Sequence, residues 1–484
     1  MKSQEVELLP TLSKKVVEGI TGFQLCSYLV ALEGWRRGLE LKWYKDESSL
    51  CKLDRMNSST HGKFYSLSNG DKLHYFFRSR GDKVANKTVR ICQDKEETKA
   101  FLEQSNVPIP IGKTLKTDKD IIHYANQIGY PVIIKPLNGS MGKGVYTNIS
   151  SENELVDILK ELRSKYSYRQ YIVEKHYNGN EYRIYVVGDK VIGATNRIPA
   201  NINGDGINTV EKLIEIKNEE RKQNPYLAPK PIKIDYEVSY MLERSGYKLD
   251  SIPKQGEQIF LREKSNLSSG GDPIEATDEL TDEVKQIAVN ALKALPAIPH
   301  AGVDIIVDPQ DKRKGVVLEV NGTAEIGFHL FPLVGKARDV PGAIIDHYFP
   351  ETENTKKTSF YFDYLSILEP IKNGAIEEIK IDKTPLNKTY AKKYTATGKL
   401  NKVGYMTRIK RYALERNLYG YAKKRDKNTV DIYLVGESQE ELNSFRDYVE
   451  KGSKKSAVKG IKEEDLKISG RPRKTGFKII TSSE

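Results

Sequence analysis

The sequence contains few cysteines and no long hydrophobic run. Only three of its 484 residues are cysteine, and their wide spacing forms neither a metal-binding pair nor a disulfide framework: Cys26, Cys51 and Cys92. No apolar stretch approaches the roughly 18 residues that a membrane helix needs. The opening "MKSQEVELLP" also lacks the apolar core of a signal peptide. We therefore expect a cytoplasmic protein with reduced thiols and no membrane partner.

Two common nucleotide-binding motifs are absent as well. The chain has no GxxxxGK[ST] and no GxGxxG that leads from a strand into a helix, so neither a P-loop nor a Rossmann site is expected. Positive charge is in excess, with a net charge of +12, and much of this excess lies after residue 380. A solvated surface is one interpretation and an anionic partner is the other. The tyrosines are dispersed, which argues against nucleic acid as a partner.

Glycine is concentrated in one loop, "KPLNGSMGKGV" (135–145), which lies between two β-rich runs. Glycine lets backbone N–H groups approach an anion closely, and lysine adds a mobile charge that suits phosphate. The pattern indicates a loop that covers a polyphosphate, with an ordinary glycine-rich hairpin turn as the alternative. Its glycines and lysines are Gly139, Gly142, Gly144, Lys135 and Lys143.

A second signal, "AGVDIIVDPQDKRKGVVLEVNGT" (301–323), reads as a β-hairpin with its turn across 309–314. If Asp308 lies opposite Gly315, alternation of side chains gives the hairpin one fully apolar face, which we expect to be core. That face consists of Val303, Ile305, Val307, Val316, Leu318 and Val320.

The other face of this hairpin is acidic. The same register places Asp304 opposite Glu319, with Asn321 two residues on. Like charges directly opposite each other destabilise a sheet, and a hard divalent cation with oxygen ligands offsets them. The face therefore predicts a metal site, and exposed, solvated acids are the alternative.

Apolar periodicity and turn residues predict a mixed α/β chain. A tight turn at Gly188 and Asp189 joins two strands, whereas residues 205–275 are polar and are expected to be loop-rich. Helices are predicted at 22–38, 118–128, 152–165 and 281–295, with a capped helix that begins in "QDKEETK" (93–99), and strands at 131–136, 145–149 and 171–174.

Six pieces of the sequence, taken in order, resemble the ATP-grasp superfamily. The region from about 90 to 335 is similar to the ligase domain of cyanophycin synthetases and of bifunctional glutathione synthetases. The resemblance implies an ATP-grasp fold that forms an amide from a carboxylate and an amine. The pieces are "DKEETK" (94–99), "GYPVIIKPLNGSMGKGV" (129–145), "YIVEKHYNGNEYRIYVVG" (171–188), "RIPANINGDGINTVEKLI" (197–214), "LREKSNLSSGGDPIEATDE" (261–279), and "AGVDIIVD" with "LEVN".

The resemblance also implies which residues bind ATP. Two lysines, Lys95 and Lys135, would contact the phosphates beneath the glycine-rich lid. Glu174 and Lys175 would lie on the strand that reads adenine through its backbone, and Glu181 would hold the ribose hydroxyls. The complete implied set is Lys95, Lys135, Gly139, Ser140, Gly142, Lys143, Gly144, Glu174, Lys175 and Glu181.

The reaction itself would depend on a second group. Arg197 would face the transferred phosphoryl group, and Asn266 and Ser268 would belong to the loop 266–271 that closes over the reacting carboxylate. The implied cofactors are ATP and Mg²⁺, with Mn²⁺ as an alternative to Mg²⁺. The metal ligands would be Asp304, Glu319 and Asn321, in agreement with the acidic face of the hairpin.

The sequence departs from this family after "EVN". It continues "NGTAEIGFH", with Glu325 where a glycine is expected, Gly327 where an arginine is expected, and His329 retained. An arginine at that position would suit a substrate carboxylate. We therefore predict a substrate other than that of the cyanophycin enzymes.

Residues 392–484 resemble a second family, the acylphosphatases. The position of that family's phosphate-binding arginine holds Met406, that of its asparagine holds Lys424, and Lys402 replaces a loop glycine. Arg408 lies two positions away from the arginine site. We expect no acylphosphatase activity, and a role in interaction, dimerisation or substrate capture.

Together these observations predict an α/β (α+β) chain. We expect an N-terminal α/β subdomain at 1–90, an ATP-grasp domain at 91–350, a linker able to hold strands at 351–391, and a ferredoxin-like βαββαβ domain at 392–484. The predicted function is ATP-dependent ligation of amino acids or small peptides, and a homodimer is the oligomeric state that we expect. An acylphosphatase-type hydrolase and a non-catalytic ATP-binding regulator are the alternatives.

Overall fold

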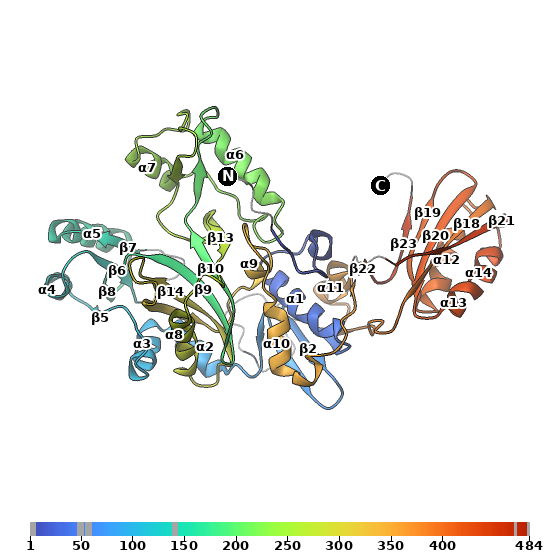
Figure 1. Ribbon diagram of the computed structural model, residues 1–484, viewed down its shortest axis with the longest axis horizontal. Coiled ribbons are helices and arrows are strands. Elements are labelled where there is room, and N and C mark those ends of the chain that lie inside the picture. The colour runs from blue at the N-terminus through green and yellow to red at the C-terminus, as the bar shows by residue number, and fades with distance from the viewer. Residues whose placement is uncertain (1–5, 46–52, 54–60, 138–143, 469–471, 482–484) are drawn as a thin grey trace.

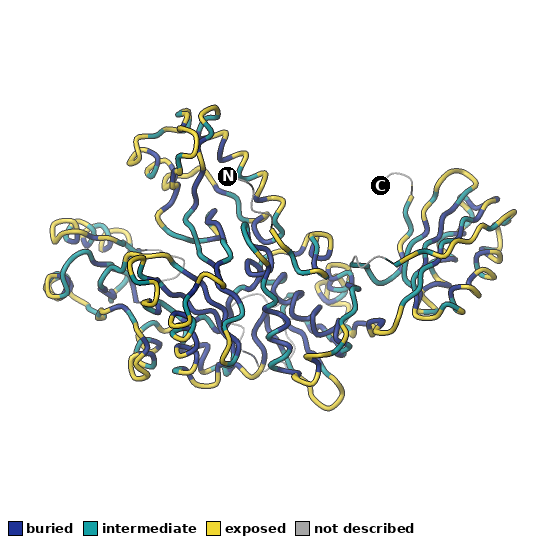
Figure 2. Tube along the Cα trace, viewed as in Figure 1, coloured by how far each residue is buried: buried dark blue, intermediate teal, exposed yellow. Residues whose placement is uncertain are grey.

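The computed structural model describes residues 6–45, 53, 61–137, 144–468 and 472–481. Figure 1 shows an elongated molecule in which the C-terminal domain, coloured orange to red, stands apart from the rest. The remainder is built around three larger sheets, and Figure 2 shows its buried residues inside and its exposed residues along the outer turns and helix faces. Within the described ranges, no helix is long and apolar enough to cross a membrane.

The N-terminal sheet is completed by a segment from much later in the chain. Its strand order is β17-β1-β2-β3-β4, and β17 pairs antiparallel with β1. The segment 351–391, predicted as a linker able to hold strands, thus supplies a strand of this sheet. The bounds are α1 (Gly22–Arg36), β1 (Glu40–Tyr44), β2 (Phe64–Ser68), β3 (Leu73–Phe77), β4 (Arg80–Gly81), α10 (Val340–Tyr348), β16 (Phe360–Tyr361), α11 (Tyr364–Lys372) and β17 (Glu378–Ile381).

Aromatic contacts hold this late segment against α1. The ring of Tyr28 lies 5.2 Å from that of Phe362 and 5.1 Å from that of Tyr364, and Trp35 lies 5.3 Å from Phe362. All four side chains are buried. Such pairs contribute roughly 0.5–1.5 kcal/mol each beyond the area that they bury. The segment is thus part of the N-terminal core.

A four-stranded sheet, β5-β8-β6-β7, carries the glycine-rich loop between β6 and β7. Helices α4 and α5 pack against it, and each begins at a side-chain cap, Thr117 and Ser151. The predicted helices 118–128 and 152–165 are confirmed. The bounds are β5 (Gly112–Leu115), α4 (Asp118–Ile128), β6 (Val132–Pro136), β7 (Tyr146–Ile149), α5 (Glu152–Lys165) and β8 (Tyr171–Lys175).

The central sheet has five strands in the order β13-β10-β9-β14-β15, and helix α8 packs on it. The predicted turn at 188–189 joins β9 to β10. The bounds are α2 (Asn86–Gln93), α3 (Lys95–Gln104), β9 (Asn180–Val187), β10 (Lys190–Ile198), β13 (Asp272–Glu275), α8 (Asp282–Lys293), β14 (His300–Val307), β15 (Gly315–Asn321) and α9 (Gly327–Leu330).

The predicted register of the β14–β15 hairpin is correct at the acidic pair and wrong near the turn. Asp304 lies opposite Glu319, as predicted, but it is Val307 rather than Asp308 that lies opposite Gly315. A β-bulge between these points absorbs the one-residue difference.

The bulge also changes which residues of β15 form core. Val317 and Val320 are buried, whereas Val316 and Leu318 are only partly buried and do not belong to the core face that the sequence predicts. An extra residue reverses the alternation of the strand beyond it. On β14 the prediction is confirmed, because Val303, Ile305 and Val307 are buried.

Residues 205–275 combine the loops that their polarity predicts with two helices that it does not predict. Helices α6 and α7 form the upper lobe in Figure 1, above the central sheet. Only a narrow stripe of α6 is apolar, with Val210, Leu213 and Ile214 buried, so its helical pattern is weak in the sequence. The bounds are β11 (Asn201–Asn203), α6 (Val210–Lys222), α7 (Tyr236–Arg244), β12 (Gln258–Phe260) and the 3₁₀ turn η2 (Leu267–Ser269).

The C-terminal domain has the predicted βαββαβ order. Its helices pack on one face of the sheet β21-β18-β20-β19-β23, in which β23 is added parallel to β19. Strand β22 pairs with β16, and Lys474 forms an ion pair with Asp363 at 2.5 Å, which joins the domain to the rest. The bounds are β18 (Tyr390–Lys399), α12 (Tyr405–Leu414), β19 (Tyr419–Lys424), β20 (Thr429–Gly436), α13 (Gln439–Ser444), α14 (Arg446–Lys451), β21 (Ala457–Leu466), β22 (Arg473–Lys474) and β23 (Phe477–Ile480).

Candidate active site

A buried carboxylate on β8 gathers lysines from two other elements. Glu174 forms ion pairs with Lys135 of β6 at 2.5 Å and with Lys99 of α3 at 2.9 Å, and its side chain is 2% exposed. Burial alone would raise the pKa of Glu174, but Lys135 and Lys99 hold it below its ordinary value. Because two ammonium groups share one carboxylate, the cluster has a net positive charge, which suits an anionic ligand.

Lys95 connects this lysine cluster with the acidic side of the site. It is the first residue of α3, which begins at the N-cap Asp94. Burial lowers the pKa of Lys95 and the charge of Lys135 lowers it further, whereas Glu319 acts in the opposite direction. The ammonium group of Lys95 thus lies within electrostatic range of both the lysine cluster and the hairpin.

The other described residues that are predicted to contact the nucleotide do not belong to this lysine cluster. Lys175 is directed away from the cluster, since its ammonium group donates to the carbonyl oxygens of Gly129 and Tyr130 at 2.9 and 3.0 Å. Gly144 has a φ of 68°, in the left-handed region that favours glycine. The predicted lid residues Gly139, Ser140, Gly142 and Lys143 lie outside the described residues.

The two acids of the hairpin have opposite electrostatic surroundings. Asp304 is buried, and its oxygens accept hydrogen bonds from Arg183 and, at 2.9 Å, from Arg197. Burial would raise the pKa of Asp304, but these arginines hold it well below its usual range. The neighbouring charge of Asp304 raises the pKa of Glu319, whose side chain is 45% exposed.

Arg197 joins two carboxylates through the same nitrogen. Its Nη2 donates to Glu181 as well as to Asp304. Glu181 also accepts a hydrogen bond from the hydroxyl of Ser265. A ribose hydroxyl at Glu181 would therefore share this carboxylate with Arg197 and Ser265.

One cavity of about 470 Å³ collects five of the predicted residues on its wall. Asp304 lies beneath the arginines, and the lysine cluster lies outside the lining. Asn321 uses its Oδ1 to accept a hydrogen bond from the backbone of Thr323 at 3.1 Å. The five residues are Arg197, Asn266, Ser268, Glu319 and Asn321.

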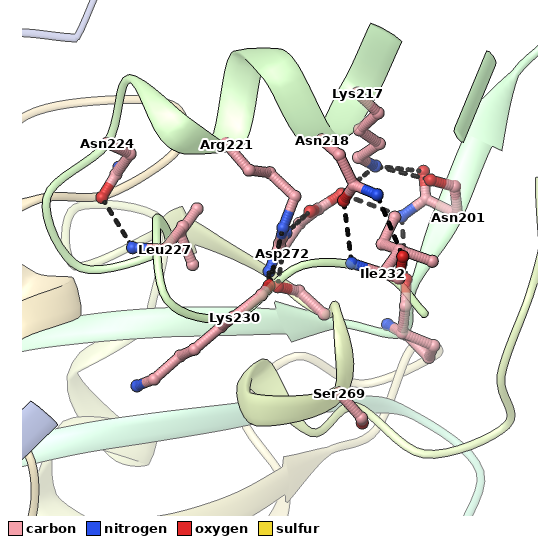
Figure 3. Close-up of polar contacts among 12 residues, drawn as sticks. Asn201, Lys217, Asn218, Arg221, Asn224, Leu227, Lys230, Ile232, Ser269 and Asp272 are labelled. Atoms are coloured by element: carbon pink, nitrogen blue, oxygen red, sulfur yellow. Dashed lines mark hydrogen bonds and ion pairs between the residues drawn. The ribbon is translucent and has the colours of Figure 1, made fainter. Parts of the chain in front are cut away.

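A buried ion network fixes the loop 266–271 beside this cavity (Figure 3). Asp272 pairs with Lys217 at 2.5 Å and with Arg221 at 2.9 Å, both from α6. Arg221 also donates to the carbonyl oxygen that ends the loop, at 3.1 Å, and to that of Lys230, at 2.9 Å. Charge-assisted hydrogen bonds of this kind attach both the loop and the segment around Lys230 to helix α6.

Sequence reasoning missed three residues of this arrangement. Arg183 stands in the otherwise apolar strand "RIYVV", and a charged residue in such a run is a signal of a buried ion pair. Lys99 lies four residues after Lys95, on the same face of a predicted helix. Ser265 has no comparable signal.

The donor set on the hairpin fits a magnesium ion. Within the described residues no group of three or more His, Cys, Asp or Glu side chains is placed to hold a metal. Two carboxylates and an amide oxygen are nevertheless the hard donors that Mg²⁺ accepts when water and phosphate complete its shell. The raised pKa of Glu319 reports a repulsion from Asp304 that a cation would relieve.

In the C-terminal domain, the positions that bind phosphate in the acylphosphatase pattern carry different side chains. Met406, in the first turn of α12, packs partly buried against the domain core, and Lys424 ends β19. Arg408 donates from its Nε to the hydroxyl of Tyr412 at 2.8 Å, so it is engaged on its own helix. Lys402 has a φ of 55°, the left-handed conformation that glycine adopts without strain.

Comparison with known families supports both assignments. Residues 92–223 match the RimK-like ATP-grasp domain, and residues 392–479 match the acylphosphatase family. The chain thus combines an ATP-grasp domain with an acylphosphatase-like domain.

Individual relatives match more than half of the chain. A cyanophycin synthetase from Geminocystis herdmanii is 32% identical over 56% of this chain and 32% of its own length. A glutathione biosynthesis bifunctional protein from Clostridium perfringens is 30% identical over 68% of this chain and 42% of its own length. The crystal structure of a bifunctional glutathione synthetase from Pasteurella multocida, 26% identical, aligns with 61% of this chain and 41% of its own, with a TM-score of 0.47. The chain therefore spans less than half the length of these relatives.

Proposed function

We propose that the chain is an ATP- and Mg²⁺-dependent ligase that joins a carboxylate to an amine on amino acid or small peptide substrates. The observation that carries this proposal is the pairing of Asp304 with Glu319 beside a cavity that also holds Arg197 and Asn321. A site that only binds ATP has less need of this complete set. The named ligases that match the chain support the same class of reaction.

The lysine cluster would receive the phosphates of ATP. Lys99 and Lys135 share one buried carboxylate, and Lys95 stands between them and the hairpin. A triphosphate placed there would neutralise the excess positive charge, because each ammonium group is a strong donor to phosphate oxygen. As the resemblance implies, the glycine-rich segment 139–144, most of which lies outside the described residues, would cover the phosphates.

The hairpin would hold the metal ion. Asp304, Glu319 and Asn321 would be its protein ligands, and the ion would supply positive charge to the phosphates. Arg197 faces the cavity from β10, which β9 separates from the hairpin, and would stabilise the charge that develops on the transferred phosphoryl group. The loop 266–271, supported by the Asp272 network, would exclude water from the reacting carboxylate.

The reaction would proceed in two displacements. An oxygen of the substrate carboxylate attacks the γ-phosphorus of ATP, and ADP leaves. The nitrogen of an amine then attacks the acyl carbon, inorganic phosphate leaves, and the amine proton is lost to solvent. Neither step needs a covalent bond to the protein, so positioning and charge stabilisation are what the residues provide.

The C-terminal domain would not take part in this chemistry. A thioether at position 406 cannot bind phosphate, and the amide that would orient water is replaced by Lys424. We propose that this domain captures a substrate or partner and leaves acyl phosphates intact.

The test is Mg²⁺-dependent release of ADP. The full chain would be assayed with amino acids and dipeptides, singly and in pairs, together with two variants of the same hairpin. Glu319→Ala removes a proposed metal ligand. Asp311→Ala removes an acid from the exposed turn and serves as the matched control.

The expected result is ADP release with a particular pair of substrates, retained in Asp311→Ala and lost in Glu319→Ala. Equal rates in the two variants would contradict the assignment of the metal site. Absence of turnover with every pair, together with tight ATP binding, would instead support a regulatory ATP-binding protein.

A further inference from the structure

Glu325, which stands where the family pattern would have a glycine, faces the cavity. Glu325 follows the metal-site strand β15, and its carboxylate lines the same cavity as Arg197 and Glu319. Its neighbours Ala324 and Ile326 are buried. Ligand cavities contain a few polar or charged groups that fix the orientation of the ligand, and Glu325 is one such group on this wall.

Two side chains from the segment after α6 hold Glu325 in place. The hydroxyl of Tyr226 donates to its Oε2 at 2.5 Å, and the ammonium group of Lys230 pairs with the same oxygen at 3.0 Å. Lys230 also lies 3.4 Å from the ring centroid of Tyr226. Among the described residues, no donor reaches the other oxygen, Oε1.

The support of Lys230 is visible in Figure 3. Its side chain extends away from the network around Asp272, whereas its backbone carbonyl is held by Arg221. Lys230 is 12% exposed. The carboxylate of Glu325 is thus oriented by groups that are themselves fixed.

The same tyrosine explains why the expected arginine is absent. A Cβ atom on Gly327 would lie 2.7 Å from Cδ2 of Tyr226. No side chain fits there without displacing the ring. The charged group that this segment presents to the cavity is therefore the carboxylate of Glu325.

A positively charged side chain from the N-terminal sheet also lines this cavity. Arg78, at the turn between β3 and β4, lines the cavity and stacks 3.5 Å from the ring centroid of Phe23. Burial lowers the pKa of Arg78, and the nearby charge of Glu325 acts in the opposite direction. Arg78 and Glu325 thus line the same cavity from different segments of the chain.

We propose that Arg78 and Glu325 form a subsite for the zwitterionic head of an α-amino acid. The substrate carboxylate would meet Arg78, its ammonium group would meet Oε1 of Glu325, and the reacting group would lie on the side chain. The role of this subsite in catalysis rests on the proposed ligase function. Binding at the subsite can nevertheless be measured without turnover.

Charge complementarity favours this occupant over a polyanion. A bidentate guanidinium suits a carboxylate, and a carboxylate with one free oxygen suits an ammonium group. An aspartate-rich chain would instead bring negative charge against Glu325, and like charges at an interface are strongly unfavourable. The subsite therefore predicts substrates with both an α-ammonium and an α-carboxylate group free.

The experiment measures binding of two probes, L-glutamate and L-lysine, to the full chain in the presence of ADP and Mg²⁺. Each probe is compared with its Nα-acetyl and its α-carboxamide derivative by titration calorimetry. In the wild type, each modification should weaken binding by about tenfold or more, since each removes one charged contact.

Two variants assign the contacts. Glu325→Gln should lose the discrimination against the Nα-acetyl derivative, and Arg78→Met should lose that against the carboxamide. Arg78→Lys keeps the positive charge and should therefore retain part of the discrimination against the carboxamide. This variant also shows whether the site still folds when Arg78 is replaced. Glu263→Gln, which removes the carboxylate of an exposed ion pair with Arg244, is the matched control and should behave as the wild type.

Failure has two distinguishable forms. If neither probe binds the wild type, or if Glu325→Gln discriminates as the wild type does, the subsite is wrong even when ADP is released with some pair. If the discrimination follows Glu325 and Arg78 but no pair releases ADP, the subsite stands and the ligase proposal fails.

Discussion

Two domains of this chain resemble families that act on phosphoryl groups, and they differ in what they have kept. The ATP-grasp part brings Lys135, Arg197 and Glu319 together around a cavity and its adjoining lysine cluster. The acylphosphatase-like domain has Met406 and Lys424 at its corresponding positions. Both have a complete apolar core. Core packing therefore preserves a fold independently of the few residues that perform chemistry.

The contrast extends to electrostatics. In the ATP-grasp part, charged groups lie close enough to shift pKa values, since Arg183 and Arg197 lower that of Asp304 and Asp304 raises that of Glu319. Perturbed groups that converge on a cavity are typical of functional sites. Arg408 of the C-terminal domain instead bonds to Tyr412 of the same helix. The predictions below can break or sharpen this contrast.

The largest effect is expected from Arg197→Met. This change removes the cation that faces the cavity from β10, and loss of one such stabilising donor typically slows a reaction by roughly 10²–10³-fold. The measurement is kcat for ADP release, with Arg244→Met, at an exposed ion pair, as the control. Unchanged kcat with a raised KM would show that Arg197 only binds substrate.

Glu174→Gln should destabilise the four-stranded sheet locally. It removes the buried charge that Lys99 and Lys135 share, and breaking such a buried pair costs roughly 3 kcal/mol. Hydrogen exchange of the β8 amides should then be about 100-fold faster. Glu161→Gln, at the exposed pair with Lys165, should leave β8 exchange unchanged. Equal exchange rates in both variants would argue against a lysine cluster organised by Glu174.

A smaller effect concerns pH. Burial and Lys135 lower the pKa of Lys95, whereas a bound phosphate would raise it again. ATP binding therefore takes up a proton, and affinity should fall as pH rises through the lowered pKa, by up to about one decade per pH unit. Equilibrium dialysis of a non-hydrolysable ATP analogue would measure this. Lys95→Arg stays protonated, so the same slope in that variant would contradict the prediction.

The last prediction is that the C-terminal domain has no acylphosphatase activity. The full chain should hydrolyse benzoyl phosphate no faster than buffer, since Met406 provides no charge for the phosphoryl group. Arg408→Ala should give the same background rate. Hydrolysis by the wild type that is lost in Arg408→Ala would show that the anion site has shifted by two residues.

Local patterns in the sequence predicted most of this contrast. The opposition of Asp304 and Glu319 follows from strand alternation, and Met406 is read directly from the acylphosphatase pattern. The bulge in β15 could not be predicted, because alternation fits Val316 and Leu318 as core equally well. The polar helices of 205–275 were missed because tertiary packing, rather than a broad apolar face, sustains them.

Long-range geometry was beyond the sequence. The pairing of β17 with β1 joins residues more than 300 positions apart, such as Leu41 and Ile381, and no local pattern marks it. Arg78 and Glu325 likewise come from separate segments and meet only at the cavity. The substitution of Glu325 was visible, but Tyr226, which excludes a side chain at Gly327, was not.

The most direct test of the account is to trap the acyl phosphate. The full chain would be incubated with ATP, Mg²⁺, amino acids or dipeptides, and hydroxylamine, and ADP, phosphate and hydroxamate would be quantified together. The account predicts hydroxamate in proportion to ADP, because the proposed ligase reaction passes through an acyl phosphate that the C-terminal domain would leave intact. Release of ADP and phosphate without hydroxamate would contradict it.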